Sequence, residues 1–197
     1  MSVQILGGQF KGYSVQVPEL VSRPTSVLLR RRLFDRYQNL SGFSFIDGLA
    51  GSGAVGFEAL SRGADSLVFV ESNYSAIQLI KKNIQGLIKW GHLENATLPI
   101  KTVQEDVIVY LRNWSVQYKQ LDLEAQKHAI IFFDPPYEKH DLYEKLRHLF
   151  FENKFFHGEL WIESEMKKGV PPDFWPKDFP PTKIINQGDS YLAIFHF

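Results

Sequence analysis

The chain has 197 residues, no cysteine, and 22 Lys or Arg against 22 Asp or Glu, so its formal net charge is zero. This length suits one domain that buries roughly 70% of the surface exposed by its unfolded form. The lack of cysteine excludes a disulfide framework, a thiolate metal site and a cysteine nucleophile, and is typical of a reducing cytoplasm. No apolar stretch reaches the roughly 20 residues that span a bilayer, and the N-terminus lacks the pattern of a signal peptide. We therefore expect a cytoplasmic protein.

The basic residues concentrate near the N-terminus. Residues 1–46 contain six Lys or Arg and two acidic residues, a balance of +4, and the rest of the chain has a balance of −4. This asymmetry is typical of a surface that binds a polyanion, although an arginine-rich helix face exposed to water gives the same pattern. The residues expected to contact such a substrate are Lys11, Arg23, Thr25, Arg30 and Arg31, with Arg32 and Arg36 as further phosphate contacts.

The first 42 residues are predicted to form an extension of the main domain. Short apolar runs flank three glycines in "VQILGGQFKGYSVQVP" (residues 3–18), and this pattern predicts a small β-hairpin or an extended arm. A helix follows within residues 23–40, with Thr25 or Ser26 as its N-cap. Its apolar stripe comprises Leu29, Leu33, Tyr37 and Leu40. We expect residues 1–42 to pack on the domain formed by residues 43–197.

From residue 43 onward, apolar strands alternate with helical segments. Strands are expected at 43–47, 66–71, 99–106, 129–133 and 159–164, and helices at 54–62, 73–90, 107–118 and 141–153. Strands that are apolar throughout and alternate with helices indicate a parallel sheet covered on both faces. Residues 182–197 instead read as two strands around a Gln-Gly-Asp turn, which predicts an antiparallel hairpin at the sheet edge. The fold class is therefore α/β.

A glycine loop follows the first strand of this domain. Residues 51–56, "GSGAVG", have the spacing G-x-G-x-x-G between a predicted strand and a predicted helix, and Glu71 ends the next strand. Glycines let the backbone approach a ligand, and the helix N-terminus offers free N–H groups. Small residues also serve helix-on-strand packing, but this context favours a nucleoside cofactor. The predicted cofactor-binding residues are Asp47, Gly51, Ser52, Gly53, Gly56, Glu71, Ser72, Asp106 and Val107.

The acidic residues around this loop favour one cofactor class. A carboxylate at Asp47 would repel the pyrophosphate of NAD, yet it could hold the ammonium group of S-adenosylmethionine directly or through water. Glu71 is placed to bind both ribose hydroxyls. Asp106, at the end of the third strand, could accept a hydrogen bond from the adenine amino group, or it could simply be a carboxylate favoured by a helix N-terminus. We therefore expect S-adenosylmethionine, with Asp47 facing the binding crevice.

The tetrapeptide Asp134-Pro135-Pro136-Tyr137 directly follows the predicted strand 129–133. Because proline cannot continue a sheet ladder, its simplest interpretation is a strand stop. Open α/β sheets, however, bind ligands at the carboxyl ends of their strands, where the glycine loop also lies. We therefore predict that these four residues are catalytic. Tyr137 would stack on a substrate base, or else be an exposed aromatic ring of the loop.

Several segments together resemble the RsmD-like family of small-subunit ribosomal RNA guanine-N2 methyltransferases. They are "ILGGQFKG", "RPTSVLLRRRLFD", "DGLAGSGAVGFEALSRGA", the pair Val70-Glu71 and "DPPY", so the resemblance covers nearly the whole chain. It implies a Rossmann-like methyltransferase fold with a mostly parallel seven-stranded sheet, an antiparallel last strand and an N-terminal hairpin and helix. It also implies methyl transfer from S-adenosylmethionine to an exocyclic amine in ribosomal RNA or the small ribosomal subunit. We expect a monomer that needs no metal, since the six histidines show no ligand spacing.

The chain departs from the family pattern at a few positions. Val27 and Arg31 stand where the family usually has acidic residues, and Leu49 replaces a usual phenylalanine before the glycine loop. The stretch between Asp106 and Asp134 is longer than expected, with residues 113–128 as the excess. These departures leave the cofactor core intact and bear on which nucleotide is modified.

The tetrapeptide suits methylation of an exocyclic amine. Such an amine is a poor nucleophile because its lone pair is delocalised into the ring. The Asp134 carboxylate and a backbone carbonyl at Pro135 would accept hydrogen bonds from the two N–H groups of the amine and so favour a pyramidal nitrogen. The prolines make the turn rigid without adding competing N–H groups. Most of the rate enhancement would come from in-line positioning of the amine and the methyl group.

Three other functions compete with RNA methylation. A DNA adenine-N6 methyltransferase shares the tetrapeptide, but sequence-specific DNA enzymes carry a recognition region for which this chain has no room. A non-catalytic nucleotide-binding or RNA-binding relative would have little reason to retain Asp134 and Tyr137. A NAD-dependent oxidoreductase is disfavoured by the charge of Asp47.

Overall fold

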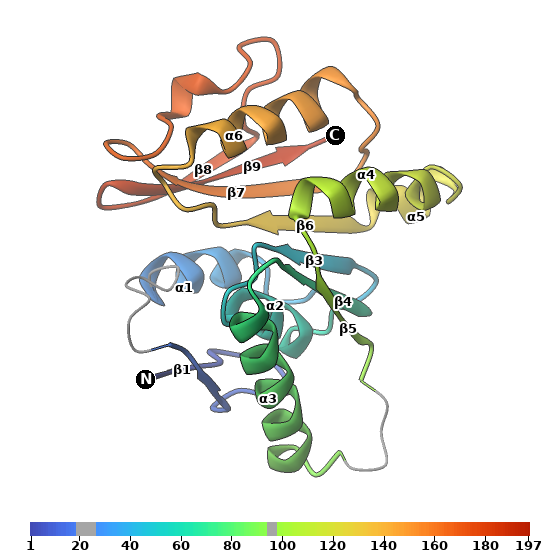
Figure 1. Cartoon of the computed structure of the whole chain (residues 1–197), viewed down its shortest axis with the longest axis vertical. Coiled ribbons are helices and arrows are strands. Elements are labelled where there is room, and N and C mark those ends of the chain that lie inside the picture. The colour runs from blue at the N-terminus through green and yellow to red at the C-terminus, as the bar shows by residue number, and fades with distance from the viewer. Residues whose placement is uncertain (19–26, 94–97) are drawn as a thin grey trace.

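The structure is a computed structural model that describes residues 1–18, 27–93 and 98–197. Within these ranges the chain forms a two-stranded N-terminal arm and a seven-stranded sheet with helices on both faces (Figure 1). The predicted substrate residues Arg23 and Thr25, and the predicted cap at Thr25 or Ser26, lie outside the described residues. No helix in the described ranges is both long enough and apolar enough to cross a membrane.

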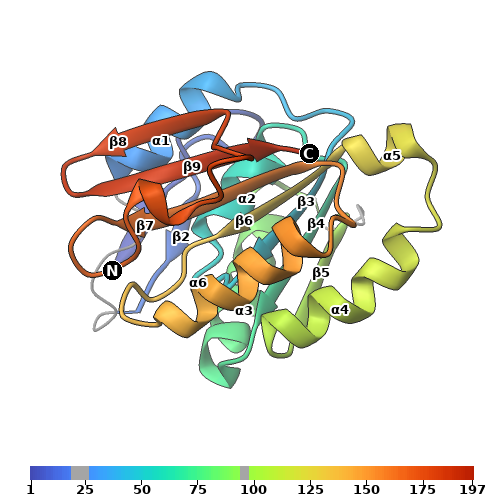
Figure 2. The same cartoon turned by 90° about the horizontal axis from the view of Figure 1, so that it is seen from above.

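The large sheet has the strand order β5-β4-β3-β6-β7-β9-β8. Its strands are β3 (Ser44–Gly48), β4 (Ser66–Glu71), β5 (Ile100–Gln104), β6 (Ala129–Phe133), β7 (Glu159–Glu165), β8 (Lys183–Gln187) and β9 (Ser190–His196). Neighbouring strands pair in parallel, except that β9 runs antiparallel to β7 and β8. Figure 2 shows the sheet from above, with β8 and β9 on the side away from β5. The predicted seven-stranded Rossmann-like sheet with an antiparallel last strand is confirmed.

Helices cover the two faces of this sheet. They are α1 (Val27–Arg36), α2 (Ala54–Ser61), α3 (Tyr74–Trp90), α4 (Val107–Tyr118), α5 (Leu123–Lys127) and α6 (His140–Arg147), which a π-helical turn (His148–Glu152) extends. The helices α1, α2 and α3 contribute to one hydrophobic cluster, and α4 and α6 to the other. In Figure 1 the first group lies in the lower part of the view, and α4 and α6 lie in the upper part.

Strand β6 explains why both faces are apolar. All five of its residues are buried. Because side chains alternate along a strand, Ile130 and Phe132 join the α1–α3 cluster, while Ile131 and Phe133 join the α4–α6 cluster. A strand buried on both faces is therefore apolar throughout, as its sequence predicted.

Helix α1 is shorter than its apolar stripe predicted. It ends at Arg36, yet Leu40 is 1% exposed and Tyr37 packs on Trp161 with ring centroids 4.4 Å apart. Both side chains thus reach the core from the segment that follows the helix, so tertiary packing, and not helical periodicity, accounts for their burial.

The extra segment 113–128 is folded. It comprises the second half of α4 and all of α5. The ring of Tyr118 stacks on Trp114 at 4.4 Å, and its hydroxyl donates to the carbonyl of Gln126 at 2.8 Å. This buried tyrosine therefore holds α5 against α4.

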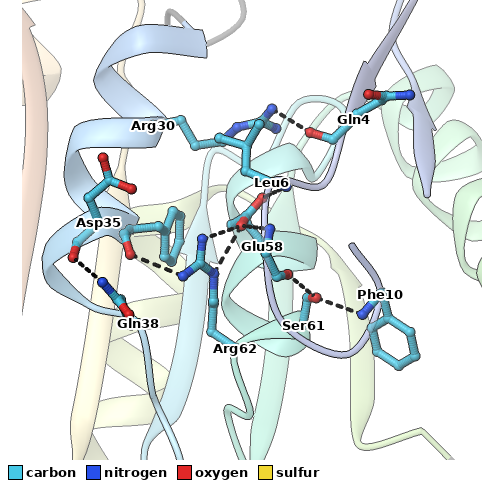
Figure 3. Close-up of polar contacts among 11 residues, drawn as sticks. Gln4, Leu6, Phe10, Arg30, Asp35, Gln38, Glu58, Ser61 and Arg62 are labelled. Carbon is cyan, nitrogen blue, oxygen red and sulfur yellow. Dashed lines mark hydrogen bonds and ion pairs between the residues drawn. The ribbon is translucent and has the colours of Figure 1, made fainter. Parts of the chain in front are cut away.

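The N-terminal arm, residues 1–18, packs on α2 and α3. Its strands β1 (Ser2–Gln4) and β2 (Ser14–Gln16) pair in the antiparallel sense, which confirms the predicted hairpin. Glu58 of α2, which is fully buried, accepts hydrogen bonds from the backbone N–H groups of Leu6 at 2.7 Å and Gly7 at 3.0 Å (Figure 3). The same carboxylate pairs with Arg62 at 3.1 Å. One buried charge therefore joins the arm to α2.

We predict that Glu58→Gln destabilises the protein by about 3 kcal/mol, because an amide replaces one acceptor oxygen with a donor and leaves the Arg62 charge uncompensated. Urea unfolding measures this change. The matched control is Glu144→Gln, which breaks an exposed pair with Arg147 and should change stability by no more than about 0.5 kcal/mol. Equal effects of the two substitutions would contradict the anchoring role of Glu58.

Candidate functional site

The glycine loop and the tetrapeptide leave the sheet from neighbouring strands. In the parallel pairing of β3 with β6, the last pair is Gly48 with Phe133. The loop to α2 begins after Gly48, and Asp134 follows Phe133 directly. The chain order also reverses between these two strands, since β4 follows β3 on one side and β7 follows β6 on the other. This reversal is where open α/β sheets form a ligand-binding crevice.

The glycines of the loop have different roles. A Cβ added at Gly53 or Gly56 would lie 2.8 Å or 2.5 Å from the ring of Phe69. These two glycines therefore serve helix-on-strand packing. Gly51 has a φ of 54°, and a Cβ added there would have no neighbour within 4 Å, so it faces open space. Gly51 is accordingly the position where the loop backbone is accessible to a ligand.

Leu49, directly before the loop, has a φ of 72°, a conformation that leucine rarely adopts. The N–H groups of Leu49 and Ala50 both donate to the carbonyl of Val70, at 2.9 Å and 3.1 Å. This pair of hydrogen bonds holds the strained turn against the end of β4. Strain of this kind is common where a loop is shaped for binding.

Asp47 lies beneath the loop. Its side chain is 1% exposed, and Oδ2 accepts a hydrogen bond from the N–H of Gly56 at 2.9 Å. Burial raises the pKa of Asp47 to about 8, against the opposing effect of the Gly56 hydrogen bond and with smaller contributions from the charges of Asp134 and Glu71. The expectation that this carboxylate opens into a crevice is therefore wrong: it is enclosed, and it orients the first turn of α2. A direct contact with a ligand ammonium group stays a prediction.

Glu71 connects the end of β4 to the loop. Its Oε2 accepts from the N–H of Gly51 at 3.0 Å, and its Oε1 accepts from the N–H of Asn73 at 2.8 Å. The structure thus brings Glu71 and Gly51 into contact, as expected for a shared site. Asn73 in turn caps α3 through its side chain, and Ser72 beside it is exposed.

Asp106 caps α4. Its Oδ1 accepts from the N–H groups of Ile108 at 2.9 Å and Val109 at 3.2 Å. The alternative that the sequence left open, a carboxylate at a helix N-terminus, is therefore realised. Asp106 remains exposed and Val107 is buried, so a further contact of Asp106 with a ligand stays a prediction.

The tetrapeptide is held by residues that the sequence analysis did not identify. The hydroxyl of Tyr137 donates to Oε1 of Glu163 at 3.0 Å and lies 3.2 Å from Oγ of Ser190. Burial, followed by the charge of Glu163, raises the pKa of Tyr137. Behind it, Tyr143 donates to the carbonyl of Glu163 at 3.1 Å and lies 3.5 Å from that of Pro135. Tyr137 is thus a tethered, half-buried ring and not a free loop aromatic.

One signal in the sequence could have identified Glu163. It stands inside the apolar strand "ELWIES" and is 2% exposed. An acidic residue at a buried strand position requires a polar partner, which points to a hydrogen-bonded site. Ser190 carries no comparable signal, because its place beside Tyr137 arises from the pairing of β9 with β7.

The first three residues of the tetrapeptide differ in accessibility. Asp134 is half-buried, Pro135 is buried and Pro136 is exposed. The carboxylate that follows β6 is therefore accessible, while the turn behind it is anchored by packing.

One of the predicted substrate contacts is wrong. Arg30 is 2% exposed and donates to the carbonyl of Gln4 at 2.8 Å (Figure 3). Burial lowers its pKa, against the opposing charge of Glu58. It therefore joins α1 to the arm and cannot reach a phosphate. Lys11 and Arg31 are exposed. In the part of the chain that the structure describes, no group of three or more His, Asp or Glu residues is arranged to bind a metal ion.

Comparison with known proteins assigns a family. A family model described as "Conserved hypothetical protein 95" matches residues 3–196. The chain belongs to this family. It is 30% identical to ribosomal RNA small subunit methyltransferase D of Escherichia coli K12 over 173 residues, which cover 86% of this chain and 78% of that protein. It is also 30% identical to the putative rRNA methyltransferase YlbH of Bacillus subtilis over 204 residues, 98% of each chain. The resemblance to RsmD-like methyltransferases is confirmed.

Solved structures agree with this assignment. The putative methyltransferase yhhF of Escherichia coli has a TM-score of 0.73 and 25% identity, over 100% of this chain and 98% of that one. The Thermus thermophilus 16S rRNA N2 G1207 methyltransferase, solved with AdoMet and guanosine, has a TM-score of 0.66 and 16% identity, over 100% of this chain and 49% of that one. At this identity the second likeness concerns the fold alone.

We predict that Asp47→Asn weakens the dependence of stability on pH between 5 and 8. Unfolded Asp47 ionises near pH 3.8, whereas the folded protein keeps the proton until about pH 8. The folded state therefore binds more protons in this interval, and the free energy of unfolding of the wild type falls as pH rises. Asparagine does not titrate, so the stability of the variant relative to wild type should rise with pH.

Urea unfolding at pH 5, 6, 7 and 8 measures this effect. The control is Asp141→Asn, because Asp141 pairs with Lys145 on the surface and its pKa is lowered, away from this interval. Parallel pH profiles for wild type and Asp47→Asn would contradict a raised pKa at Asp47.

Proposed function

We propose that this protein is an S-adenosylmethionine-dependent methyltransferase that modifies an exocyclic base amine of ribosomal RNA, at guanine N2 of the small subunit. The observation that carries the proposal is the placement of Asp134-Pro135-Pro136-Tyr137 beside the glycine loop, on adjacent strand ends. The family assignment supports the reaction class, since its curated relatives are named as methyltransferases of small-subunit ribosomal RNA. We further propose that it acts in the cytoplasm, as a monomer, with residues 1–42 packed on the methyltransferase domain 43–197.

The residues around the loop fit S-adenosylmethionine. Gly51 faces open space, Glu71 stands beside it at the end of β4, and Asp106 is exposed at the end of β5. In this arrangement Glu71 would bind the ribose hydroxyls and Asp106 the adenine amino group. Asp47 is enclosed, so it would help to bind the ammonium group of the cofactor by orienting the glycine loop. Once Asp47 has lost its own proton, its carboxylate could also contact the ammonium group directly. When bound, this cofactor supplies an electrophilic methyl group.

Asp134 is the proposed catalytic residue. Its carboxylate would accept a hydrogen bond from one N–H of the target amine, and the carbonyl of Pro135 would accept one from the other. These contacts favour a pyramidal nitrogen whose lone pair points at the methyl carbon, and they stabilise the positive charge that develops on the amine. After the N–C bond forms, the positively charged nitrogen would release one proton to the Asp134 carboxylate. Tyr143 lies behind the carbonyl of Pro135 and would hold this turn in place.

Tyr137 is proposed to position the target base. Its hydroxyl is held by Glu163 and Ser190, so its ring has a defined orientation beside Asp134. A ring held in this way loses little entropy when a base stacks on it. The base must leave its stack to reach the methyl group, and ring stacking offsets part of that cost.

We expect Asp134→Ala to lower the rate of methyl transfer by at least about 100-fold, because the variant lacks the carboxylate that stabilises the positive charge developing on the amine. The assay follows tritiated methyl transfer to Bacillus subtilis 16S ribosomal RNA, to assembled small subunits and to genomic DNA in parallel. Mass spectrometry of nucleosides then identifies the product, for which we expect N2-methylguanosine. N6-methyladenine in DNA would replace this proposal with a DNA methyltransferase.

Two further variants interpret that result. Asp134→Asn keeps the volume and one acceptor oxygen but not the charge, so intermediate activity is expected. Asp141→Asn, on the exposed face of α6, should retain activity. Calorimetry should find S-adenosylmethionine binding unchanged within about threefold in all three variants, since Asp134 is proposed to contact the amine. Undiminished turnover by Asp134→Ala would remove it from the mechanism.

We expect Tyr137→Ala to raise the KM for RNA by about tenfold or more, because base stacking contributes on the order of 1–3 kcal/mol. Tyr137→Phe keeps the ring but loses the tether to Glu163, so it should affect KM less and lower kcat by a few-fold. Steady-state kinetics with saturating S-adenosylmethionine separates the two parameters. Unchanged KM in Tyr137→Ala would exclude stacking on this ring.

A further inference from the structure

A groove of about 570 Å³ lies between β2 of the arm and α3, away from the catalytic tetrapeptide. We call it the arm–α3 groove; its lining includes Tyr13, Ser14 and Gln16 of the arm and Lys82, Gln85 and Lys89 of α3. The lining has two cations and no acidic residue, although acids and bases balance in the whole chain. The groove is therefore a local electropositive surface.

The groove has fixed walls. Gly86 allows the arm to approach α3 closely, since a Cβ at this position would lie 2.5 Å from the hydroxyl of Tyr13. That hydroxyl donates to the carbonyl of Asn83 at 2.7 Å. The side-chain amide of Asn83 also accepts from the N–H of Gln16 at 2.9 Å and donates to its carbonyl at 3.0 Å. These contacts are buried or partly buried, so the groove is a preformed feature of the fold.

The two lysines are positioned to bind one polyanionic chain. They are seven residues apart, or about two helical turns, so they share one face of α3. Both are exposed, and within the described ranges neither ammonium group has a carboxylate within 4.0 Å. Trp90, next to Lys89, is 47% exposed, with its ring centroid 5.8 Å from that of Tyr13. Exposed aromatic rings beside cations are typical of surfaces that bind single-stranded nucleic acid.

The groove is continuous with the proposed cofactor loop. Besides its contacts with Gln16, the amide of Asn83 donates to the carbonyl of Ser52 at 3.3 Å. Asn83 is 1% exposed, so this bridge is inside the protein. The floor of the groove therefore contacts the glycine loop, and α3 begins three residues after Glu71. A chain bound in the groove would lie next to the loop that is proposed to hold the methyl donor.

We infer that the arm–α3 groove binds the ribose-phosphate backbone of the RNA that flanks the target base. This inference rests on the proposed function and assigns it a substrate surface outside the arginine-rich helix α1. Lys82 and Lys89 contact phosphates, the hydroxyl and amide groups of the arm contact sugars and phosphates, and the exposed Trp90 ring stacks on a base. Since most of these contacts are with the phosphates and sugars of the RNA, they position the RNA without selecting a base sequence.

The test compares Lys82→Gln/Lys89→Gln with Lys81→Gln in the full-length protein. Lys81 is exposed on the same helix but is not part of the groove lining, so it controls for loss of positive charge on α3. Binding to protein-free Bacillus subtilis 16S ribosomal RNA is measured at 50, 100 and 200 mM salt. The double variant should bind about tenfold more weakly at 100 mM, with a salt slope smaller by about two, and the control should match wild type. Melting temperature and S-adenosylmethionine affinity should stay unchanged in both.

A crosslinking experiment locates the RNA. Because the chain has no cysteine, Gln85→Cys or Lys81→Cys creates a single thiol for a photoreactive probe. Gln85 lines the groove, so its probe should crosslink to the 16S RNA, while the probe at position 81 should give at most a fifth of that yield. Equal yields, or equal RNA affinity of the lysine variants, would overturn the inference.

Other outcomes separate the two proposals. If wild type methylates RNA while the double lysine variant retains full RNA affinity, the groove proposal fails and the proposed function stands. If wild type binds RNA through the groove but methylates no RNA substrate, the proposed function fails. If the lysines affect binding of the assembled subunit but not of free RNA, the groove contacts a ribosomal protein, and the RNA assignment is overturned.

Discussion

The parallel pairing of β3 with β6 is the constraint on which the candidate site depends. It ends at Gly48 and Phe133, so the glycine loop and Asp134 leave the sheet side by side although they are more than 80 positions apart in the sequence. Parallel pairing requires both strands to be buried under helices on each face, which is why β6 is apolar at every position. The buried sheet thus fixes the ends of its strands, and the polar residues of the candidate site follow directly after these ends.

Acidic residues at the ends of β3, β4 and β5 hold the neighbouring backbone in place without any ligand. Asp47 and Asp106 accept hydrogen bonds from backbone N–H groups of the helices that follow them, and Glu71 accepts from Gly51 of the glycine loop and from Asn73. A carboxylate with such partners has a defined position, and this lowers the entropy lost on binding. For Glu71 and Asp106 the structural contact and the proposed ligand contact are compatible, because each side chain is at least partly accessible. Asp47 differs because it is enclosed, so its main effect is on the orientation of α2.

The N-terminal arm belongs to the same system. Glu58 holds its first half on α2, the helix that begins at the glycine loop, and Asn83 joins its second half to Ser52 within that loop. In the proposed function, contacts between RNA and the arm would therefore act on residues that Asn83 links to the glycine loop. The proposed substrate surface and the proposed cofactor loop are thus joined by hydrogen bonds through Asn83, while Glu163 holds Tyr137 after the end of β6.

The sequence by itself determined the α/β class, the order of the strands and of the helices other than α5, the glycine loop and the tetrapeptide, because these follow from local periodicity, turn chemistry and motif spacing. Tertiary structure decided what each polar side chain does. Arg30 looks like a surface arginine in the sequence, yet it is buried against the arm, and Tyr137 looks like a loop aromatic, yet Glu163 and Ser190 hold its hydroxyl. Such roles depend on partners from distant segments, which local patterns do not encode. The arm–α3 groove was likewise invisible in the sequence, because its two walls are about 70 residues apart and meet only through packing.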